Sequence, residues 1–452
     1  MIVAIAGASG FVGRALTVQL LGGGHNVVAL SRSMNQISTE ARMVAVDVGD
    51  EAATAGALAG ADVAYYLVHS MAGGGGFREV DLRLATTFGR AAAVAGVGRI
   101  IYVGALGDGP SSTHLASRHE VGGALGAAGV AVVELRAAVV FGSGSISFEM
   151  LRYLTERLPA MVCPRWVHTR IQPIALCDLL AYLEQSMRVA PGVYEIGGAD
   201  VTTYRDMIAQ YAHVRGLHAR RVVDIPWLTP RLSSYWVDLV TPVDRSISHA
   251  LIESLVTEVV VVDPEPARQA FSVVPMGIDR ALSAALDDQS EEVTRSLFSR
   301  CDGLIDGVYS VVTDVAVPPG AEDALVRDLE AIGGSFGWYG ARLGWMARIV
   351  LGRLVGEHLR RRRPSAVKPG ELVDWWRIAG VRSGELVLRG VGWFPGDAWL
   401  GYRTDRGTLR QVAALRPRGV SGFLYWKLLA PVHHIVFSRM ARHRIRRASE
   451  TA

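Results

Sequence analysis

Cysteine is scarce in this 452-residue chain, which contains three. Cys163, Cys177 and Cys301 lie far apart, form no CxxC pair and leave an odd count. This spacing argues against a disulfide framework and against a zinc knuckle. His433 and His434 are adjacent in sequence and lack a third ligand at metal spacing. We therefore expect a reducing compartment and no metal site.

The chain has no large excess of charge of one sign, since it contains 47 Lys and Arg residues and 43 Asp and Glu residues. Arginine is concentrated in two places, Arg360 to Arg363 and Arg439 to Arg447. Neither cluster belongs to a known nucleic-acid-reading motif, and such runs are usually solvated faces. We expect no nucleic-acid partner.

Long apolar runs are absent as well. The first one, at 2–6, has no basic start and leads directly into a glycine turn, which argues against a signal peptide. The most hydrophobic helical stretch, at 338–354, is interrupted by Arg342 and Arg348, which would be costly inside a bilayer. We predict no transmembrane segment and a cytoplasmic protein; nothing in the sequence indicates its oligomeric state.

The chain does have size and apolar content, with 50% hydrophobic residues. Its length exceeds what one core usually supports, so we expect at least two domains. Short apolar runs alternate with longer amphipathic ones up to Arg136, which predicts an α/β Rossmann-like, doubly wound parallel sheet. The predicted strands are 2–6, 27–31, 43–46, 63–67, 100–103 and 130–135, and the predicted helices are 11–21, 79–95 and 117–128.

Beyond Arg136 the pattern loosens, and we interpret the next elements as substrate-side additions to the same domain. These are helices at 148–158, 178–187 and 203–215, short strands at 171–174 and 193–196, and helical cover at 228–240 and 245–255. An acidic, proline-bearing stretch then resembles a linker. We predict a first domain at 1–260, a linker at 261–292 and a second domain at 293–447, with strands at 385–390, 398–402 and 408–415 and a final helix at 422–447.

A glycine-rich loop comes directly after the first strand and opens the first helix. In a dinucleotide-binding turn, Gly7 would permit the tight turn, Gly10 the approach of the diphosphate, and Gly13 close packing of the helix. The amides at the helix N-terminus would face the anion. The residues we expect to contact the coenzyme here are Gly7, Ser9, Gly10, Phe11, Val12 and Gly13.

The residue after the second strand indicates which coenzyme binds. NAD-specific proteins commonly place an acidic side chain there, whereas this chain has Arg32. A guanidinium suits a 2′-phosphate, so NADP(H) is favoured over NAD(H), although Arg32 could also be a plain surface charge. Asp47 and Val48, after the third strand, are placed to meet the adenine; alternatively Asp47 only caps the next element of the chain.

The glycine spacing, Asp47 and the run from Leu135 to Gly142 resemble the extended and atypical short-chain dehydrogenase/reductase superfamily, and NmrA-like members most of all. The run from Tyr65 to Met71 is similar to an atypical bacterial NAD(P)-binding group. The resemblance covers about 1–255. Catalytic members use a Tyr-x-x-x-Lys pair and a serine, and this chain departs from all three: His114 and Arg118 take the first two places, and Ala105 ends the fifth strand.

His114 is therefore one candidate for the acid, with Arg118 as a fixed positive charge beside the ribose. The competing interpretation is that His114 is a polar residue lining a pocket. His69 follows the fourth strand and could touch the nicotinamide side. Tyr65 and Tyr66 alternate across that strand, so we expect one in the core and the other toward the crevice.

The C-terminal region resembles a domain of unknown function of the START and polyketide-cyclase type, an α+β helix-grip fold. The resemblance rests on four stretches, at 337–339, 373–377, 393–400 and 423–434. Such a sheet around a helix often leaves an apolar cavity, so a small apolar ligand is conceivable. Trp375, Trp376, Trp393 and Trp399 could line such a cavity, although aromatic residues at alternating positions are more often core.

The sequence supports three functional interpretations. The first is an NADP(H)-binding, oxidoreductase-like protein acting on an apolar carbonyl, enone or quinone compound without the usual triad. The second is a non-catalytic NADP(H) sensor of NmrA-like type, and the third is a lipid carrier with a vestigial nucleotide fold. The missing triad leaves open whether the chain is an enzyme.

Overall fold

The computed structural model describes residues 1–32, 40–69, 76–107, 113–225, 255–298, 307–330, 332, 367–382, 384–391 and 394–451. The chain divides into two compact units, Met1–Asp288 and Gln289–Ala452. Several predictions fall outside the described residues: the helix at 228–240, the helix at 245–255 apart from Leu255, the apolar stretch 338–354, Cys301 and Trp393.

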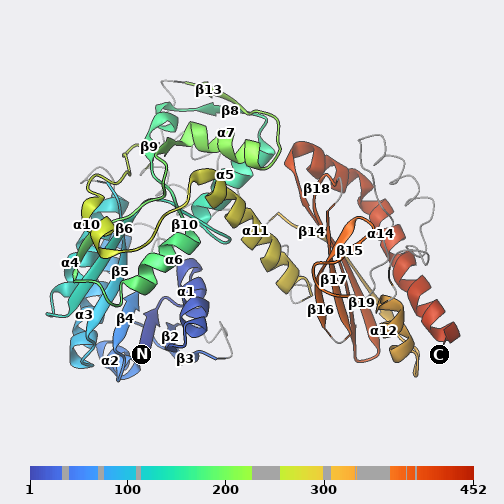
Figure 1. Cartoon of the computed structure of the whole chain (residues 1–452), viewed down its shortest axis with the longest axis horizontal. Helices are drawn as coiled ribbons and strands as arrows, with labels where there is room; N and C mark the ends of the chain where they lie inside the picture. Colours follow the sequence, from blue (N-terminus) through green and yellow to red (C-terminus); the bar gives the residue numbers. More distant parts are fainter. Residues whose placement is uncertain are drawn as a thin grey trace. The chain divides into compact units, whose positions relative to one another are not determined.

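The N-terminal unit is built on a seven-stranded parallel sheet in the order β11-β6-β5-β4-β1-β2-β3 (Figure 1). Strand order reverses between β1 and β4, the place where a doubly wound sheet opens a ligand crevice. The predicted Rossmann-like sheet is therefore confirmed. Its strands are β1 (Ile2–Ala6), β2 (Asn26–Ser31), β3 (Arg42–Ala45), β4 (Val63–Tyr66), β5 (Arg99–Ala105), β6 (Ala131–Ala137) and β11 (Gly192–Glu195).

Helices bury both faces of this sheet, as the alternation along β1 requires. Val3 and Ile5 pack in one cluster with residues of α1 (Phe11–Gly22) and α6 (Leu176–Gln185). Ala4 and Ala6 pack in another with α2 (Glu51–Leu58), α3 (Phe77–Val94) and α4 (Thr113–Gly126). Helix α2 has no counterpart among the helices predicted from the sequence.

One prediction about the sheet is wrong. The strand expected at 193–196 was assigned to the substrate-side additions, but β11 pairs in parallel with β6 and extends the main sheet. The helix expected at 178–187 among these additions is α6, which packs on the main sheet. The remaining additions, which include the predicted helices at 148–158 and 203–215, are β7 (Val140–Phe141), α5 (Ile146–Arg157), β8 (Ala160–Cys163), the 3₁₀ helix η2 (Arg165–His168), β9 (Arg170–Ile171), β10 (Ile174–Ala175), β12 (Thr202–Thr203), α7 (Tyr204–Val214) and β13 (Arg221–Asp224).

The stretch expected to be a linker is largely helical, with α10 (Glu265–Ala270) and α11 (Ile278–Ser296). Ile278 and Leu282, early in α11, are buried in a cluster of the N-terminal unit. Val293, near its end, and Leu297 just beyond it belong to a core cluster of the C-terminal unit. The boundary between the two units, at Asp288 and Gln289, therefore falls within helix α11.

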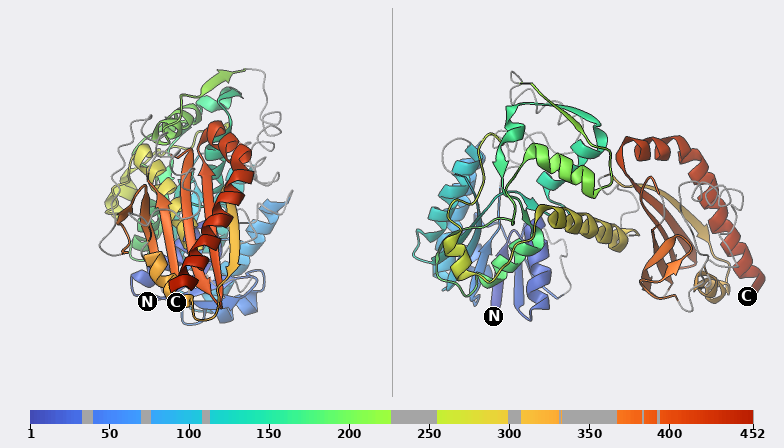
Figure 2. Two further views of the ribbon diagram at one scale, coloured as in Figure 1. Left: turned by 90° about the vertical axis from the view of Figure 1, so that its right-hand side faces the viewer. Right: turned by 45° about the horizontal axis from the view of Figure 1, so that its top comes forward.

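The C-terminal unit is a six-stranded antiparallel sheet in the order β14-β19-β18-β17-β16-β15. Figure 2 shows α14 lying across one face of it, and its residues share a buried cluster with those of α12. The elements are β14 (Tyr309–Ala316), α12 (Glu322–Glu330), β15 (Leu372–Val373), β16 (Trp376–Arg382), β17 (Glu385–Gly390), β18 (Gly396–Asp405), β19 (Thr408–Pro417) and α14 (Gly419–Thr451).

Trp375, Trp376 and Trp399 are buried in the two core clusters of this unit. The Nε1 of Trp399 donates a hydrogen bond of 3.1 Å to Thr294 Oγ1. These three tryptophans are core residues, as the second of the two interpretations of the sequence predicted. Among the helices that the structure describes, none is long and apolar enough to cross a membrane.

Candidate functional site

The turn between β1 and α1 depends on two glycines. Gly7 has a φ of +84°, and a Cβ there would stand 2.7 Å from the carbonyl oxygen of Leu67. A Cβ on Gly13 would stand 2.3 Å from the carbonyl oxygen of Gly7. Any larger residue at either position would push the start of α1 away from the ends of β1 and β4.

The N-terminus of α1 is open to an anion. Gly10 is its N-cap, and its own amide donates to Gly7 O at 3.0 Å. No described side chain caps the helix, and no acidic residue stands in its first turn. The amides of Phe11, Val12 and Gly13 lie in this turn, where a helix leaves its N–H groups unpaired. A diphosphate fits this cradle in charge and in hydrogen-bonding capacity.

Three further predicted contact residues, Arg32, Asp47 and Val48, follow the ends of β2 and β3. Ser31 Oγ donates to Ser9 Oγ at 3.2 Å, which ties the end of β2 to the glycine turn, and the next residue, Arg32, is exposed. Asp47 is exposed and accepts a hydrogen bond of 2.9 Å from Gly49 N, whereas Val48 is buried. Parallel strands bring Arg32 and Asp47 to the same edge of the sheet as the glycine turn.

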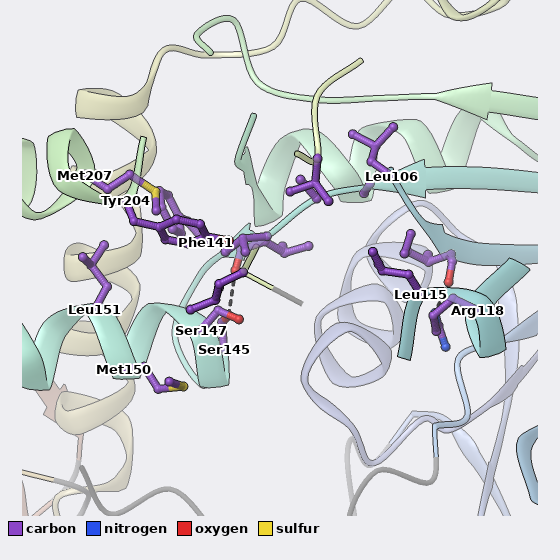
Figure 3. A pocket seen from close by; sticks show the side chains of 18 of the residues that line it. Leu106, Leu115, Arg118, Phe141, Ser145, Ser147, Met150, Leu151, Tyr204 and Met207 are labelled. Atoms are coloured by element: carbon purple, nitrogen blue, oxygen red, sulfur yellow. Dashed lines mark hydrogen bonds between the residues drawn. The ribbon is translucent and has the colours of Figure 1, made fainter. Parts of the chain in front are cut away.

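A cavity of about 350 Å³ adjoins this edge (Figure 3). Phe11 forms part of its wall, so it begins where the glycine turn ends. Leu115 and Arg118 from α4 line one side, and Leu151, Tyr204 and Met207 from α5 and α7 line the other. The remaining lining residues are mostly apolar: Val103, Leu106, Val139, Phe141, Met150, Leu154, Trp166, Ile208, Leu255 and Val259 among them.

The hydroxyl groups on the α5 side of the cavity are partly used by the fold. Ser145 Oγ donates to the carbonyl of Val140 at 2.6 Å, and Ser145 is the N-cap of α5. Trp166 and Tyr204 meet edge to face, with ring centroids 5.7 Å apart. A bound molecule would therefore meet mainly carbon on this side, with Ser147 as a further hydroxyl in the lining.

His69 is one of the few polar residues that line the cavity. Its Nδ1 lies 2.9 Å from Oδ2 of Asp81, whose side chain is 3% exposed, while the His69 side chain is 25% exposed. Burial of the ring lowers the pKa of His69 from its ordinary value of 6.5. The hydrogen bond to Asp81 raises this pKa, and the positive charge of Arg118 lowers it further. His69 was expected from sequence, but its partner Asp81 was not.

Arg118 is held against the sheet. Its guanidinium donates to the carbonyl oxygen of Val103 and lies 4.8 Å from the ring centroid of Tyr102, whose hydroxyl donates to the carbonyl of Arg118 at 2.9 Å. Ala105, at the end of β5, lines the cavity. His114 lies in the first turn of α4, and its side chain is outside the described residues.

The expectation that Tyr65 or Tyr66 leans toward the crevice is wrong. Tyr65 is buried on one face of the sheet, where its hydroxyl donates to the carbonyl of Leu183 at 2.8 Å. Tyr66 is buried on the other face, with its ring centroid 5.0 Å from that of Phe88. Because helices cover both faces, alternation along a strand leads to two cores rather than to a core and a crevice.

Two family models match separate parts of the chain. Residues 7–138 match one described as NAD(P)H-binding, and residues 307–440 match one described as a protein of unknown function. Uncharacterised proteins of Mycobacterium bovis and Mycobacterium tuberculosis are 26% identical over 249 residues, which is 51% of this chain. The chain spans 28% of the length of these relatives.

Solved structures resemble the N-terminal part of the chain. The UDP-glucose 4-epimerase of Thermus thermophilus in complex with NAD has a TM-score of 0.51 at 16% identity, covering 64% of this chain and 99% of its own. The epimerase of Thermotoga maritima has a TM-score of 0.51 at 13% identity, covering 65% and 100%. This likeness concerns the fold. Together with the match over residues 7–138, it shows that the N-terminal unit has a Rossmann-type fold, similar to that of NAD(P)H-binding proteins.

Proposed function

We propose that this protein is an NADP(H)-dependent oxidoreductase that acts on an apolar alcohol or carbonyl compound bound in the cavity beside the glycine turn. The observation that supports this most is the position of Phe11, which belongs both to the turn and to the cavity wall. A coenzyme held by the turn would place its reactive ring toward the carboxyl ends of β4 and β5, where His69 and Ala105 line the same cavity.

The lining argues for an apolar substrate. UDP-glucose, named for the epimerases of similar fold, carries phosphates and several hydroxyls that need polar partners. Here the side chains of the cavity are largely aliphatic or aromatic, with His69, Arg118, Ser145 and Ser147 as exceptions. A ketone, enone or quinone would bury carbon over most of its surface and bring its oxygen to one of these polar side chains.

The choice of NADP(H) over NAD(H) rests on Arg32. It is exposed at the carboxyl end of β2, one residue beyond the Ser31 hydroxyl that bonds to the glycine turn. A guanidinium there can pair with a 2′-phosphate through two hydrogen bonds, and NAD(H) lacks that phosphate. Asp47 and Val48 would lie toward the adenine.

Consumption of NADPH with a panel of ketones, enals and quinones tests the proposal. Ser147→Trp introduces a large ring into the cavity wall on α5 and should abolish turnover while coenzyme binding persists. Ile146→Trp is the matched control, because Ile146 is exposed on the same helix and does not line the cavity. Equal turnover by both variants would count against the cavity as the substrate site.

A non-catalytic NADP(H) sensor is the second candidate. The observation that favours it is the replacement of the usual serine and lysine by Ala105 and by Arg118, whose guanidinium is engaged by the carbonyl of Val103. Tight NADPH binding without consumption of any panel compound would support this function. For the C-terminal unit, the START-type fold and an apolar ligand remain predictions.

A further inference from the structure

We propose that His69 and Asp81 form a general-base dyad that takes the hydroxyl proton when an alcohol in the cavity is oxidised. The proposal rests on the proposed function, since it requires a coenzyme at the glycine turn and an apolar compound in the cavity. It supplies the proton transfer that the missing Tyr-x-x-x-Lys pair would otherwise perform.

The geometry assigns a role to each nitrogen of the ring. A carboxylate can only accept hydrogen bonds, so Asp81 Oδ2, 2.9 Å from Nδ1, fixes the proton on Nδ1. In the neutral ring the lone pair is then on Nε2. Asp81 is held inside α3 with 3% of its side chain exposed, whereas His69 is partly exposed and lines the cavity.

The electrostatic surroundings keep the ring neutral near pH 7. Burial and the positive charge of Arg118, on α4, both disfavour the imidazolium, and Asp81 on α3 offsets them in part, so the pKa of His69 stays below its ordinary value. Tyr66 on β4 is un-ionised, because burial and the charge of Asp81 raise its pKa. A neutral imidazole with its lone pair on Nε2 is a proton acceptor.

The reaction is balanced in atoms and electrons. The O–H bond of a secondary alcohol breaks, and its proton moves to His69 Nε2. The C–H bond of the same carbinol carbon breaks with both electrons, so the alcohol is oxidised to a ketone. The hydride would pass to an NADP⁺ held at the glycine turn, which would be the oxidant. In the direction of ketone reduction, the imidazolium would return the proton to the oxygen.

Nitrogen NMR of the ¹⁵N-histidine-labelled full chain tests the dyad without any turnover, with His69→Gln used to assign the signal. We expect Nδ1 to be the protonated nitrogen of the neutral ring and the ring to titrate below pH 6.5. Asp81→Asn should lower this pKa further, because it removes the carboxylate that favours the imidazolium. A proton on Nε2, or titration at or above pH 6.5, would overturn the assignment.

Oxidation of 1-phenylethanol, cyclohexanol and 2-decanol with NADP⁺ tests the role. His69→Gln should reduce kcat/KM by roughly 100-fold or more, in the range expected of general bases, with NADP⁺ affinity unchanged. His213→Gln, an exposed position near the end of α7, should leave both unchanged. In the wild type, kcat/KM should fall as the pH drops through the pKa of His69, because the imidazolium cannot accept a proton.

Calorimetry with NADP⁺ is done first and separates two kinds of failure. If the wild type binds no coenzyme, the proposed function is refuted. The general-base role is then refuted too, even if NMR finds the proton on Nδ1, because no hydride acceptor is bound. If NADP⁺ binds but His69→Gln retains activity within twofold, only the base assignment is refuted. If NADP⁺ binds and no alcohol is oxidised, the base assignment is refuted, and the NADPH-consumption panel decides between the oxidoreductase and the sensor. The kinetics of Asp81→Asn are compared with those of the wild type only if both bind NADP⁺ with the same affinity. If they do not, His69→Gln alone tests the base assignment.

Discussion

At the scale of single residues, the glycine turn is the most demanding feature of the chain. A methyl group on Gly13 would stand 2.3 Å from a backbone oxygen, which cannot move away as a flexible side chain could. We predict that Gly13→Ala abolishes coenzyme binding and costs about 1–3 kcal/mol of unfolding free energy, as overpacking does.

Urea denaturation and calorimetry check this prediction. Gly22→Ala is the control, because it lies in the same helix and a Cβ there would meet nothing within 4 Å. That change should be neutral or stabilise the protein by up to about 1 kcal/mol. Equal behaviour of the two variants would show that the turn is not tightly constrained.

Arg32 should decide which coenzyme is preferred. Arg32→Glu removes a partner of the 2′-phosphate and adds repulsion, so NADP(H) affinity should fall by more than about tenfold, in line with about 1.5–3 kcal/mol for a charged hydrogen bond. NAD(H) affinity should change little. Arg42→Glu, at the exposed start of β3, serves as the control. If the ratio of NADP(H) affinity to NAD(H) affinity does not change, Arg32 is a surface charge that does not contact the 2′-phosphate.

At the level of single residues, the sequence could locate cavity-lining side chains where the signal is local, and their contacts with a coenzyme stay predictions. His69 could be proposed because it directly follows a buried strand, and the structure places it in the cavity lining. Asp81 could not, since it lies 12 residues away on α3 and only the packing of that helix brings it to the ring. Arg118 could be located, but its bond to Val103 could not.

At the scale of elements, α5 and α7 form a wall of the cavity and are joined by a buried ionic network. Glu156 Oε1 accepts hydrogen bonds from the Tyr211 hydroxyl at 2.7 Å and from Arg215 Nε at 2.9 Å. Glu156→Ala would leave a guanidinium buried without this carboxylate, so we predict a loss of roughly 3–5 kcal/mol in unfolding free energy.

Chemical denaturation measures this loss against an exposed ion pair. Arg446 and Glu450 on α14 are 79% and 62% exposed, and such pairs contribute about 0–1 kcal/mol. Glu450→Ala should therefore change stability by less than about 1 kcal/mol. A similarly small effect of Glu156→Ala would mean that the network does not hold α5 to α7.

Elements with a strong periodic pattern could be predicted, and weakly patterned ones could not. The run at 2–6 became β1 with the same bounds, because its apolar residues are continuous and end in glycine. Helix α2, Glu51–Leu58, is mostly alanine, glycine and threonine and lacks an apolar stripe. The pairing of β11 with β6 was missed because pairing partners are set by the three-dimensional fold.

At the scale of the whole molecule, the division into two units was expected, but the nature of the connecting segment was not. Its acidic and proline-rich composition suggested a linker, yet Ile278 and Leu282 are four residues apart and buried, as on one face of a helix. That spacing was available in the sequence. The cavity was not, because its walls come from β5, β6, α4, α5 and α7.

Two units with separate cores should respond differently to the coenzyme. We predict two transitions in differential scanning calorimetry, of which NADPH raises only the one that belongs to Met1–Asp288. A ligand at 100 times its Kd stabilises the state that binds it by about 2.7 kcal/mol. A single transition that moves as a whole would contradict this independence.

Every activity proposed for this chain requires a dinucleotide at the glycine turn, and isothermal titration calorimetry of the full chain with NADPH, NADP⁺, NADH and NAD⁺ measures that binding. We predict one coenzyme molecule per chain, with the phosphorylated pair bound more tightly and all binding lost in Gly13→Ala. The absence of binding heat with all four coenzymes, or binding that survives in Gly13→Ala, would contradict it.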